Sequence, residues 1–240
     1  MDKRFEREAL LLGEDALSIL SGARVALFGV GGVGSYAAEA LARGGIGSIE
    51  LIDNDCVSLT NINRQLCALE STVGQLKVSV VASRLREINP NIEVTERTEF
   101  FLPETKDSFD FSKYDFVIDA IDTVSGKIAI VECALEAGVP MISCMGTGNK
   151  LDPTAFKVCD IQKTNTCPLA RVMRRELKKR GINHLKVVYS EETALTPKYT
   201  APEKNGKPVP GSISFVPSVA GLIAAGEAIK TIIEKAGSNE

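Results

Sequence analysis

Runs of consecutive apolar residues alternate along the chain with stretches in which apolar positions recur at helical spacing. The short runs, of which 24–29 is the first, predict buried strands, and the amphipathic stretches, of which 33–43 is the first, predict helices. Strands that alternate with helices are typical of an α/β fold with a Rossmann-like, mostly parallel, twisted sheet flanked by helices. The other expected strands are 48–53, 92–96, 114–119, 140–144, 156–160 and 185–189, and the other expected helices are 75–88, 126–137, 168–180 and one at the C-terminus.

The regular alternation ends near residue 148. We expect one domain over 1–240, because 240 residues with 44% hydrophobic content suit one substantial core. Residues 1–148 would form a nucleotide-binding unit, and 149–240 would extend the sheet in a mixed arrangement. The stretch 191–211 carries four prolines, which predicts a loop that is mobile or ordered only by a partner.

The most apolar segment, 214–226, is interrupted by Pro217 and followed by Glu227. It falls short of the about 20 apolar residues that a membrane span needs, so a buried helix is expected. The N-terminal residues are charged and amphipathic and do not resemble a secretory signal. We therefore expect a cytoplasmic protein without stable membrane insertion.

The first expected strand runs directly into Gly29-Val30-Gly31-Gly32-Val33-Gly34, which satisfies G-x-G-x-x-G between a strand and a helix. Glycines let the backbone approach a phosphate, and the helix N-terminus offers free N–H groups and a positive dipole. Asp53, at the end of the second expected strand, stands where a carboxylate can accept both ribose hydroxyls. The residues that predict a dinucleotide or adenosine-phosphate site are Gly29, Gly31, Gly32, Gly34 and Asp53, and a tight turn without ligand is the alternative.

A dense polar stretch occupies residues 53–65 and includes Asp55. Asn61, Arg64 and Gln65 can donate to phosphate oxygens, and the guanidinium fork of Arg64 suits phosphate. Lys77 lies in the first turn of the next expected helix, where a cation is unfavourable unless an anion is nearby. A hydride-transfer enzyme has no need for these groups, so the stretch favours phosphate binding over its alternative, an ordinary solvated loop.

Asp119 and Asp122 follow the strongest expected strand, 114–119, at the edge of the sheet where ligands of such folds bind. Asp122 is expected to hold Mg²⁺ against a triphosphate. For Asp119, bracing the loop is at least as good an interpretation as a catalytic role.

Six cysteines, at positions 56, 67, 133, 144, 159 and 167, form no C-x-x-C pair. This argues against a zinc site and against a disulfide-stapled domain. The first five are interpreted as small core residues, and Cys167 is expected to cap the helix that begins at Pro168 rather than to act as a nucleophile. His184 is the one histidine and is expected at the surface.

Positive charge concentrates in residues 163–186, whose net charge of +7 leaves −10 for the rest of a chain with net charge −3. A protein that is basic throughout is thereby excluded, whereas a local anion-binding face is not. The candidates on the expected helix 168–180 are Arg171, Arg174, Arg175, Lys178 and Lys179, and a solvated helix surface is the alternative.

Several motifs together resemble the ThiF/MoeB-type family of ubiquitin-activating-like enzymes: GVGGVGS, LIDNDCVSLTNINRQ, GQLK and AIDTVSGK. Within this family, RFEREALLLGEDAL, CPLARVMRRELKKRGI, and VVYSEE followed by PGSISFVPSVAGL are similar to the tRNA threonylcarbamoyladenosine dehydratase group. The resemblance covers nearly the whole chain and implies a ThiF/MoeB-type fold, with 149–240 as the substrate and dimer portion. It implies an ATP- and Mg²⁺-dependent enzyme that adenylates and then cyclises threonylcarbamoyladenosine in tRNA.

The resemblance also implies roles for individual residues. Asp53 would hold the ribose, the 29–34 loop with Arg64 and Gln65 would bind phosphates, and Lys77 would contact the triphosphate. Arg7 matches an N-terminal arginine that reaches the partner subunit's ATP site, which implies a homodimer. The expected catalytic residues are therefore Arg64, Lys77, Asp122 and Arg7, and the basic helix is the expected contact for tRNA phosphates.

Other functions stay open at this point. Adenylation of the C-terminus of a ubiquitin-like sulfur-carrier protein shares the ATP site, and a sulfur-transfer protein is a further candidate partner. Such enzymes usually carry two C-x-x-C pairs for zinc, and this chain has none, so no zinc is expected. A nucleotide-binding scaffold without turnover is the third hypothesis, and an NAD dehydrogenase is a distant fourth. The stretch 209–214 has no cysteine, which favours direct attack on the adenylate over a thioester step.

Overall fold

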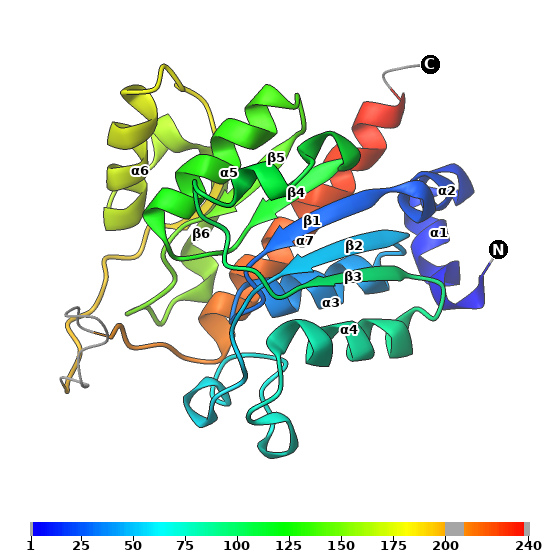
Figure 1. The fold of residues 1–240 in the computed structure, drawn as a ribbon, viewed down its shortest axis with the longest axis horizontal. Helices are drawn as coiled ribbons and strands as arrows, with labels where there is room; N and C mark the ends of the chain where they lie inside the picture. The colour runs from blue at the N-terminus through cyan, green and yellow to red at the C-terminus, as the bar shows by residue number, and fades with distance from the viewer. Residues whose placement is uncertain (1, 200–208, 238–240) are drawn as a thin grey trace.

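One mixed sheet organises the chain (Figure 1). The structure is a computed structural model and describes residues 2–199 and 209–237. Within them the strand order is β3-β2-β1-β4-β5-β7-β6, in which only β6 runs antiparallel to its neighbour. The strands are β1 (Arg24–Phe28), β2 (Ser48–Ile52), β3 (Glu93–Arg97), β4 (Phe116–Asp119), β5 (Met141–Cys144), β6 (Phe156–Asp160) and β7 (Lys186–Ser190). The expected α/β fold, with a mostly parallel sheet and a mixed C-terminal extension, is confirmed.

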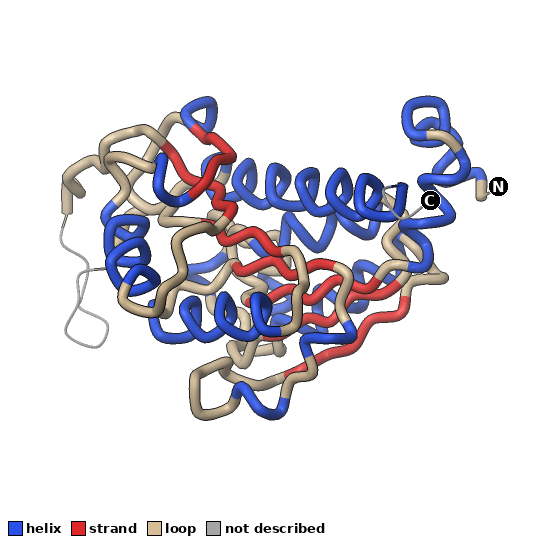
Figure 2. Tube along the Cα trace, turned by 90° about the horizontal axis from the view of Figure 1, so that it is seen from above, coloured by secondary structure: helices blue, strands red, loops and turns tan. Residues whose placement is uncertain are grey.

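Helices cover both faces of this sheet, as Figure 2 shows from above. The central strands β1 and β4 are apolar except for Arg24 at the start of β1 and Asp119 at the end of β4, because both faces of the sheet are covered there. One face carries α3 and α7, and the opposite face carries an aromatic cluster in which the Phe28 ring contacts Phe101, Phe109 and Phe111. The helices are α1 (Glu6–Leu12), α2 (Glu14–Gly22), α3 (Gly34–Arg43), α4 (Lys77–Ile88), α5 (Val124–Glu136), α6 (Pro168–Lys178) and α7 (Phe215–Gly237).

The apolar C-terminal helix α7 packs against the body of the fold along one side. It packs on α3, α2, β4 and β5, and its inward side chains include Val216, Ala224 and Ile232. By length and composition α7 could cross a membrane, but half of its most apolar window is buried in the protein. A side chain at Gly221 would lie 2.2 Å from the Val33 carbonyl oxygen, so glycine is what allows α7 to approach α3 so closely. The expected buried helix is confirmed.

The N-terminal helices are the main elements that hydrophobic patterning leaves unidentified. Helices α1 and α2 are joined at Gly13, which has φ +84°. None of the α1 side chains is buried, and α1 packs mainly on α2 and on the short turn before it. The long loop expected at 191–211 is described only at its two ends, since 200–208 lie outside the described residues.

Candidate nucleotide-binding site

A cleft of about 770 Å³ opens where the strand order reverses, between the carboxyl ends of β1 and β4. Ligands of open α/β sheets bind at this switch point, because the loops leaving the two strands turn to opposite faces and part. The cleft is lined by the glycine loop, the polar stretch 53–65 with Ile52 before it, Lys77, and the loops 99–101 and 120–122. Residues later in the chain also line it, namely Thr147, 209–212 and Pro217.

The glycine loop has the conformation expected of a phosphate-binding turn. Gly29 has φ +87°, and a Cβ there would lie 2.8 Å from the Ala120 carbonyl oxygen. At Gly34 a Cβ would lie 1.8 Å from the Gly29 carbonyl oxygen, so this glycine allows helix α3 to start directly against the strand end. Gly31 and Gly32 line the cleft in front of the N-terminus of α3, where N–H groups and the helix dipole favour an anion.

Asp53 braces the glycine loop as well as facing the cleft. Its two carboxylate oxygens accept hydrogen bonds from the backbone N–H groups of Val30 (2.7 Å) and Asp55 (2.8 Å). These bonds hold the carboxylate at the end of β2, on the cleft wall. Each carboxylate oxygen can accept a further hydrogen bond, so the expected ribose contact and the bracing role are compatible.

Lys77 forms an ion pair with Asp55, at 2.7 Å between Nζ and Oδ2. The lysine side chain is 6% exposed and that of Asp55 is 59% exposed. The anion that a first-turn lysine needs is thus a carboxylate of the chain itself, on the rim of the cleft. A triphosphate entering the cleft would share or replace this partner, because Lys77 and Asp55 both line it.

Arg64 and Gln65 lie against the glycine loop, as the sequence predicts. Arg64 donates from Nη1 to the Thr60 carbonyl oxygen (2.9 Å) and to the Asn63 side chain (3.0 Å). Its remaining N–H groups make no hydrogen bond within the described residues, and burial lowers the pKa of this guanidinium. Asn61 also lines the cleft, but its side-chain oxygen caps the short helical turn at Leu59–Asn61 by accepting from Ser58 N–H.

The two aspartates after β4 have different environments. Asp122 is exposed and lines the cleft. Asp119 is completely buried and binds Lys127 Nζ with both oxygens at 2.9 Å, and it accepts the Ser143 hydroxyl at 2.5 Å. The bracing interpretation of Asp119 is therefore confirmed. Sequence reasoning missed Lys127, although it stands in the first turn of α5 and gives the same signal as Lys77 in α4.

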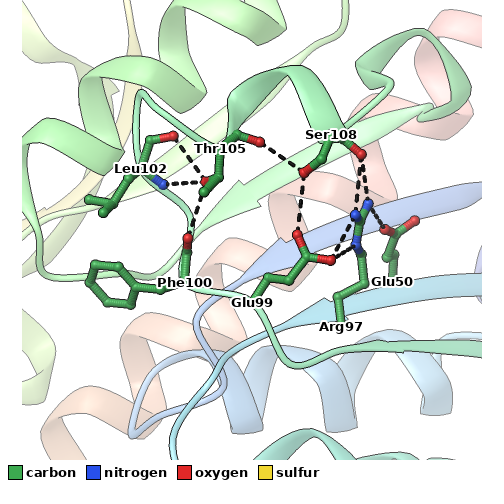
Figure 3. A network of polar contacts seen from close by, with 7 residues as sticks. All are labelled: Glu50, Arg97, Glu99, Phe100, Leu102, Thr105 and Ser108. Atoms are coloured by element: carbon green, nitrogen blue, oxygen red, sulfur yellow. Dashed lines mark hydrogen bonds and ion pairs between the residues drawn. The ribbon is translucent and has the colours of Figure 1, made fainter.

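A network around Arg97 shapes the loop that carries Glu99, Phe100 and Phe101 into the cleft (Figure 3). Arg97 binds the carboxylates of Glu50 (3.3 Å) and Glu99 (2.9 Å). It also donates to the Ser108 carbonyl oxygen, and its guanidinium carbon lies 3.9 Å from the centre of the Phe109 ring. One side chain therefore joins two neighbouring strands to the loop, and this leaves the Phe100 ring half-exposed at the cleft.

The cysteines correct one expectation and refine another. Cys56 is exposed in the polar stretch beside the cleft and is not a core residue, whereas Cys67 and Cys144 are buried. Cys167 occupies the N-cap position of α6, but its thiol makes no capping hydrogen bond and packs into the apolar cluster under that helix. His184 is a surface residue, 3.1 Å from an Asp160 oxygen.

The basic helix α6 presents most, but not all, of its predicted cations to solvent. Arg171, Arg175, Lys178 and Lys179 are exposed. Arg174 instead turns inward, where its guanidinium donates to the Thr164 carbonyl oxygen (2.8 Å), to the Thr164 hydroxyl and to the Ile161 carbonyl oxygen. The helix therefore keeps a cationic outer face while Arg174 ties it to the preceding turn.

Arg7 does not lie in the cleft of its own chain. It is exposed on α1, at the edge of the sheet where the strands begin, whereas the cleft is at the edge where the parallel strands end (Figure 1). The structure thus brings together Arg64, Lys77, Asp122 and the glycine loop and leaves Arg7 and the α6 cations outside.

A phosphate loop at the switch point, a carboxylate at the ribose position and converging cations define a nucleotide-binding α/β protein. The chain belongs to the ThiF family, which its residues 5–240 match. It is 44% identical over 241 residues to the tRNA threonylcarbamoyladenosine dehydratase of Bacillus subtilis, covering 96% of this chain and 95% of that protein.

A solved structure agrees with this family. The crystal structure of E. coli tRNA N6-threonylcarbamoyladenosine dehydratase in complex with ATP matches with a TM-score of 0.90 and 37% identity, covering 99% of this chain and 97% of that chain. The E. coli molybdopterin-synthase adenylyltransferase is 34% identical over 142 residues, which is 58% of this chain and 57% of that protein. The resemblance inferred from the sequence motifs is confirmed.

Proposed function

We propose that this chain is a cytoplasmic, ATP-dependent tRNA threonylcarbamoyladenosine dehydratase. The observation that carries the proposal is the match to two such enzymes over almost the whole chain, including the part after residue 148. The adenylyltransferase match, by contrast, spans little more than half of the chain. The nucleotide cleft alone does not identify the acceptor. The match over the residues after 148 is what favours tRNA.

The proposed reaction has two steps. The carboxylate of the threonyl group attacks the α-phosphate of ATP, which forms an acyl-adenylate and expels pyrophosphate. A nucleophile of the same modified base then attacks the acyl carbon and expels AMP, so the ring closes with net loss of water from the tRNA. Arg64 and Lys77, on the wall of the cleft, stabilise the charge that develops on the pyrophosphate. Asp53 orients the ribose, and the N–H groups before α3 hold the phosphates.

The cleft also suits Mg²⁺ held jointly by the protein and the nucleotide. No three His, Cys, Asp or Glu side chains converge to hold a metal within residues 2–199 and 209–237. Mg²⁺ bound to triphosphates takes one or two carboxylates and completes its shell with phosphate oxygens and water. Asp122 is an exposed carboxylate on the cleft wall and fits this pattern. Bound there, the ion would neutralise phosphate charge.

The tRNA contact is proposed on the outer face of α6. Arg171, Arg175, Lys178 and Lys179 are exposed on one helix. Arg175 and Lys179 both contact the single acid of the helix, Glu176, which leaves a net positive surface. Recognition of RNA by backbone charge and shape requires no base-reading module.

A homodimer would complete the ATP site with Arg7. Leu10 and Leu11, next to Arg7 on α1, are 83% and 86% exposed. At the opposite end of the molecule, Leu59 and Leu69 are 61% and 57% exposed on the loops bordering the cleft. In a two-fold dimer the α1 of one copy would cover these loops of the other, which buries both apolar surfaces and brings Arg7 to the partner's cleft.

Pyrophosphate release from ATP tests the proposed function. The enzyme is incubated with threonylcarbamoyladenosine-modified tRNA, with unmodified tRNA, or with a carrier protein ending in Gly-Gly. Release only with the modified tRNA is expected, together with a cyclised nucleoside whose mass is lower by one water. Release only with the carrier protein would replace the proposal by sulfur-carrier adenylation, and no release with any acceptor would identify a non-catalytic nucleotide-binding scaffold.

A further inference from the structure

Asn149 has a backbone conformation that few residues other than glycine adopt. Its φ is +58°, in the left-handed region, and it lies in the loop that follows β5. Strained residues persist where the surrounding structure holds them, and they concentrate at functional sites. The bonds that Asn149 makes show what this conformation achieves.

Asn149 ties together two segments that are far apart in the sequence. Its N–H donates to the Gly211 carbonyl oxygen at 2.7 Å, and its side-chain oxygen accepts from Gly211 N–H at 2.6 Å. Its carbonyl oxygen accepts from Leu195 N–H at 2.7 Å. One residue thus holds the chain both before and after 200–208, through described residues only.

A second contact brings the same segment against the cleft. A Cβ at Gly148 would lie 2.9 Å from Pro210 Cβ, so the absence of a side chain there allows Pro210 to pack on this loop. On the other side, Asn63 donates from its side chain to the Ser212 carbonyl oxygen at 2.9 Å. The stretch 209–212 is therefore fixed between the loop after β5 and the neighbour of Arg64.

This fixed stretch forms one wall of the nucleotide cleft. The wall consists of Thr147, Val209, Pro210 and Ser212 and carries no ionised group. The rest of the cleft is lined by the carboxylates of Asp53, Asp55, Glu99 and Asp122 and by the cations Arg64 and Lys77. An incoming carboxylate is repelled by those carboxylates and not by the neutral wall, whose lining residues include the hydroxyl-bearing Thr147 and Ser212.

We propose that Asn149 is a positioning residue that builds the acceptor side of the cleft, where a carboxylate-bearing group on a nucleoside approaches the α-phosphate. The inference rests on the proposed function for the identity of the acceptor. Asn149 acts through 209–212 and, within the described residues, makes no hydrogen bond to the glycine loop or to Asp53. Its loss is therefore expected to impair the acceptor more than the nucleotide, because 209–212 is linked to Arg64 only indirectly, through Asn63.

Asn149→Gly provides the sharpest variant, because glycine adopts φ +58° without strain and removes only the side-chain bond to Gly211. Gly148→Ala keeps Asn149 but adds a side chain that would push against Pro210, and so displaces the same wall. For both variants kcat/KM for the modified tRNA is expected to fall about tenfold or more, as misplacement of an acceptor by a fraction of an ångström does. The Kd for ATP, measured by calorimetry without tRNA, is expected to stay within about twofold. The matched control is Asn91→Gly, an exposed position at the opposite edge of the sheet.

Two results would overturn the inference. The first is that both Asn149→Gly and Gly148→Ala keep the wild-type kcat/KM for tRNA. The second is that their affinity for ATP falls by the same factor as kcat/KM for tRNA, which would indicate general disruption of the cleft. Failure of the proposed function gives a different pattern, since the wild type itself would then release no pyrophosphate with the modified tRNA. If the wild type responds only to the carrier protein, the same variants are measured with that acceptor.

Discussion

Two lysines at the starts of helices form ion pairs that differ in their accessibility to a ligand. Lys77 and Lys127 both stand in the first turn of a helix; Lys77 pairs with Asp55 in the loop after β2, and Lys127 pairs with Asp119 at the end of β4. The partner of Lys77 is exposed on the cleft, whereas Asp119, the partner of Lys127, is inaccessible. The first pair is thus open to exchange with a phosphate, and the second is fixed as part of the scaffold.

Replacing Arg64 should remove most of the chemical step without affecting the fold. For Arg64→Ala, we expect kcat for pyrophosphate release to fall about 100-fold or more, because a preorganised donor to the developing charge is lost. The thermal unfolding midpoint should hardly change, since within the described residues the guanidinium hydrogen-bonds only to its chain neighbours Thr60 and Asn63. Arg43→Ala is the control at the far end of α3, where Arg43 pairs with Glu39. A near-normal rate in Arg64→Ala would mean that the phosphate site is misassigned.

Removing Lys127 should affect stability above all. Lys127→Met leaves the Asp119 carboxylate buried without its charge partner, and such a loss costs about 3–5 kcal/mol in the free energy of unfolding. Urea denaturation measures this difference. The double variant Asp119→Asn with Lys127→Met should recover more than half of the loss, because no uncompensated charge remains. Equal instability of the single and double variants would contradict this interpretation.

An ion pair between helices α3 and α4 predicts that the stability of the fold depends on pH. Glu39 on α3 binds Arg84 on α4 and Arg43 on its own helix. Burial raises the pKa of Glu39, but the hydrogen bonds from Arg84 and Arg43 outweigh it and hold the pKa below its ordinary value of 4.5. A carboxyl whose pKa is lower in the folded state stabilises the fold above its unfolded pKa, and this contribution is lost as the pH falls.

We expect the Glu39→Gln variant to have a lower free energy of unfolding than the wild type. This difference should be largest near pH 7 and should shrink below about pH 4.5. Denaturation with urea at a series of pH values measures it. A deficit that is constant over the whole series would show that charge is not the cause.

The exposed cations of α6 should give salt-dependent tRNA binding, and Arg174 supplies an internal control. Removing a phosphate contact lowers the slope of log affinity against log salt by about 1 per contact. Arg171→Ala with Lys178→Ala should therefore lower both affinity and slope and leave ATP binding intact. Arg174→Ala should leave the slope unchanged, because this guanidinium bonds Thr164 and Ile161 inside the protein. An unchanged slope in the double variant would make α6 an ordinary surface helix.

The sequence predicts those elements whose causes are local. The strand ends at Phe28 and Ile52 and the turn at Gly29 follow from apolar runs and from the need for a left-handed φ. The inward turn of Arg174 and the bonds of Asn149 to Gly211 could not be predicted, because each depends on a partner that only the tertiary fold brings close. The prediction that Cys56 is a core residue is wrong because only its neighbour Val57 points into the core, while Cys56 itself is exposed.

At the scale of the whole molecule, a subunit-mixing experiment decides whether Arg7 acts in the partner's cleft. Arg7→Ala and Arg64→Ala homodimers should both be nearly inactive. In a mixed dimer, the cleft of the Arg7→Ala subunit keeps its own Arg64 and receives an intact Arg7 from the other subunit. Random mixing should then restore about a quarter of the wild-type rate, since half of the dimers are mixed and one cleft in each is complete. No restoration on mixing would assign Arg7 to its own chain or to no role.

The position of α7 has a consequence for synthesis on the ribosome. The helix covers α3 and the strands β4 and β5, all of which are translated much earlier. Until α7 emerges, the nascent chain exposes the sheet face that this helix will bury. The turn at Val33 also lacks its packing partner, which is α7 at Gly221. Completion of the nucleotide cleft is thereby delayed until late in translation. Unfinished chains would bind ATP poorly and offer an apolar surface to chaperones.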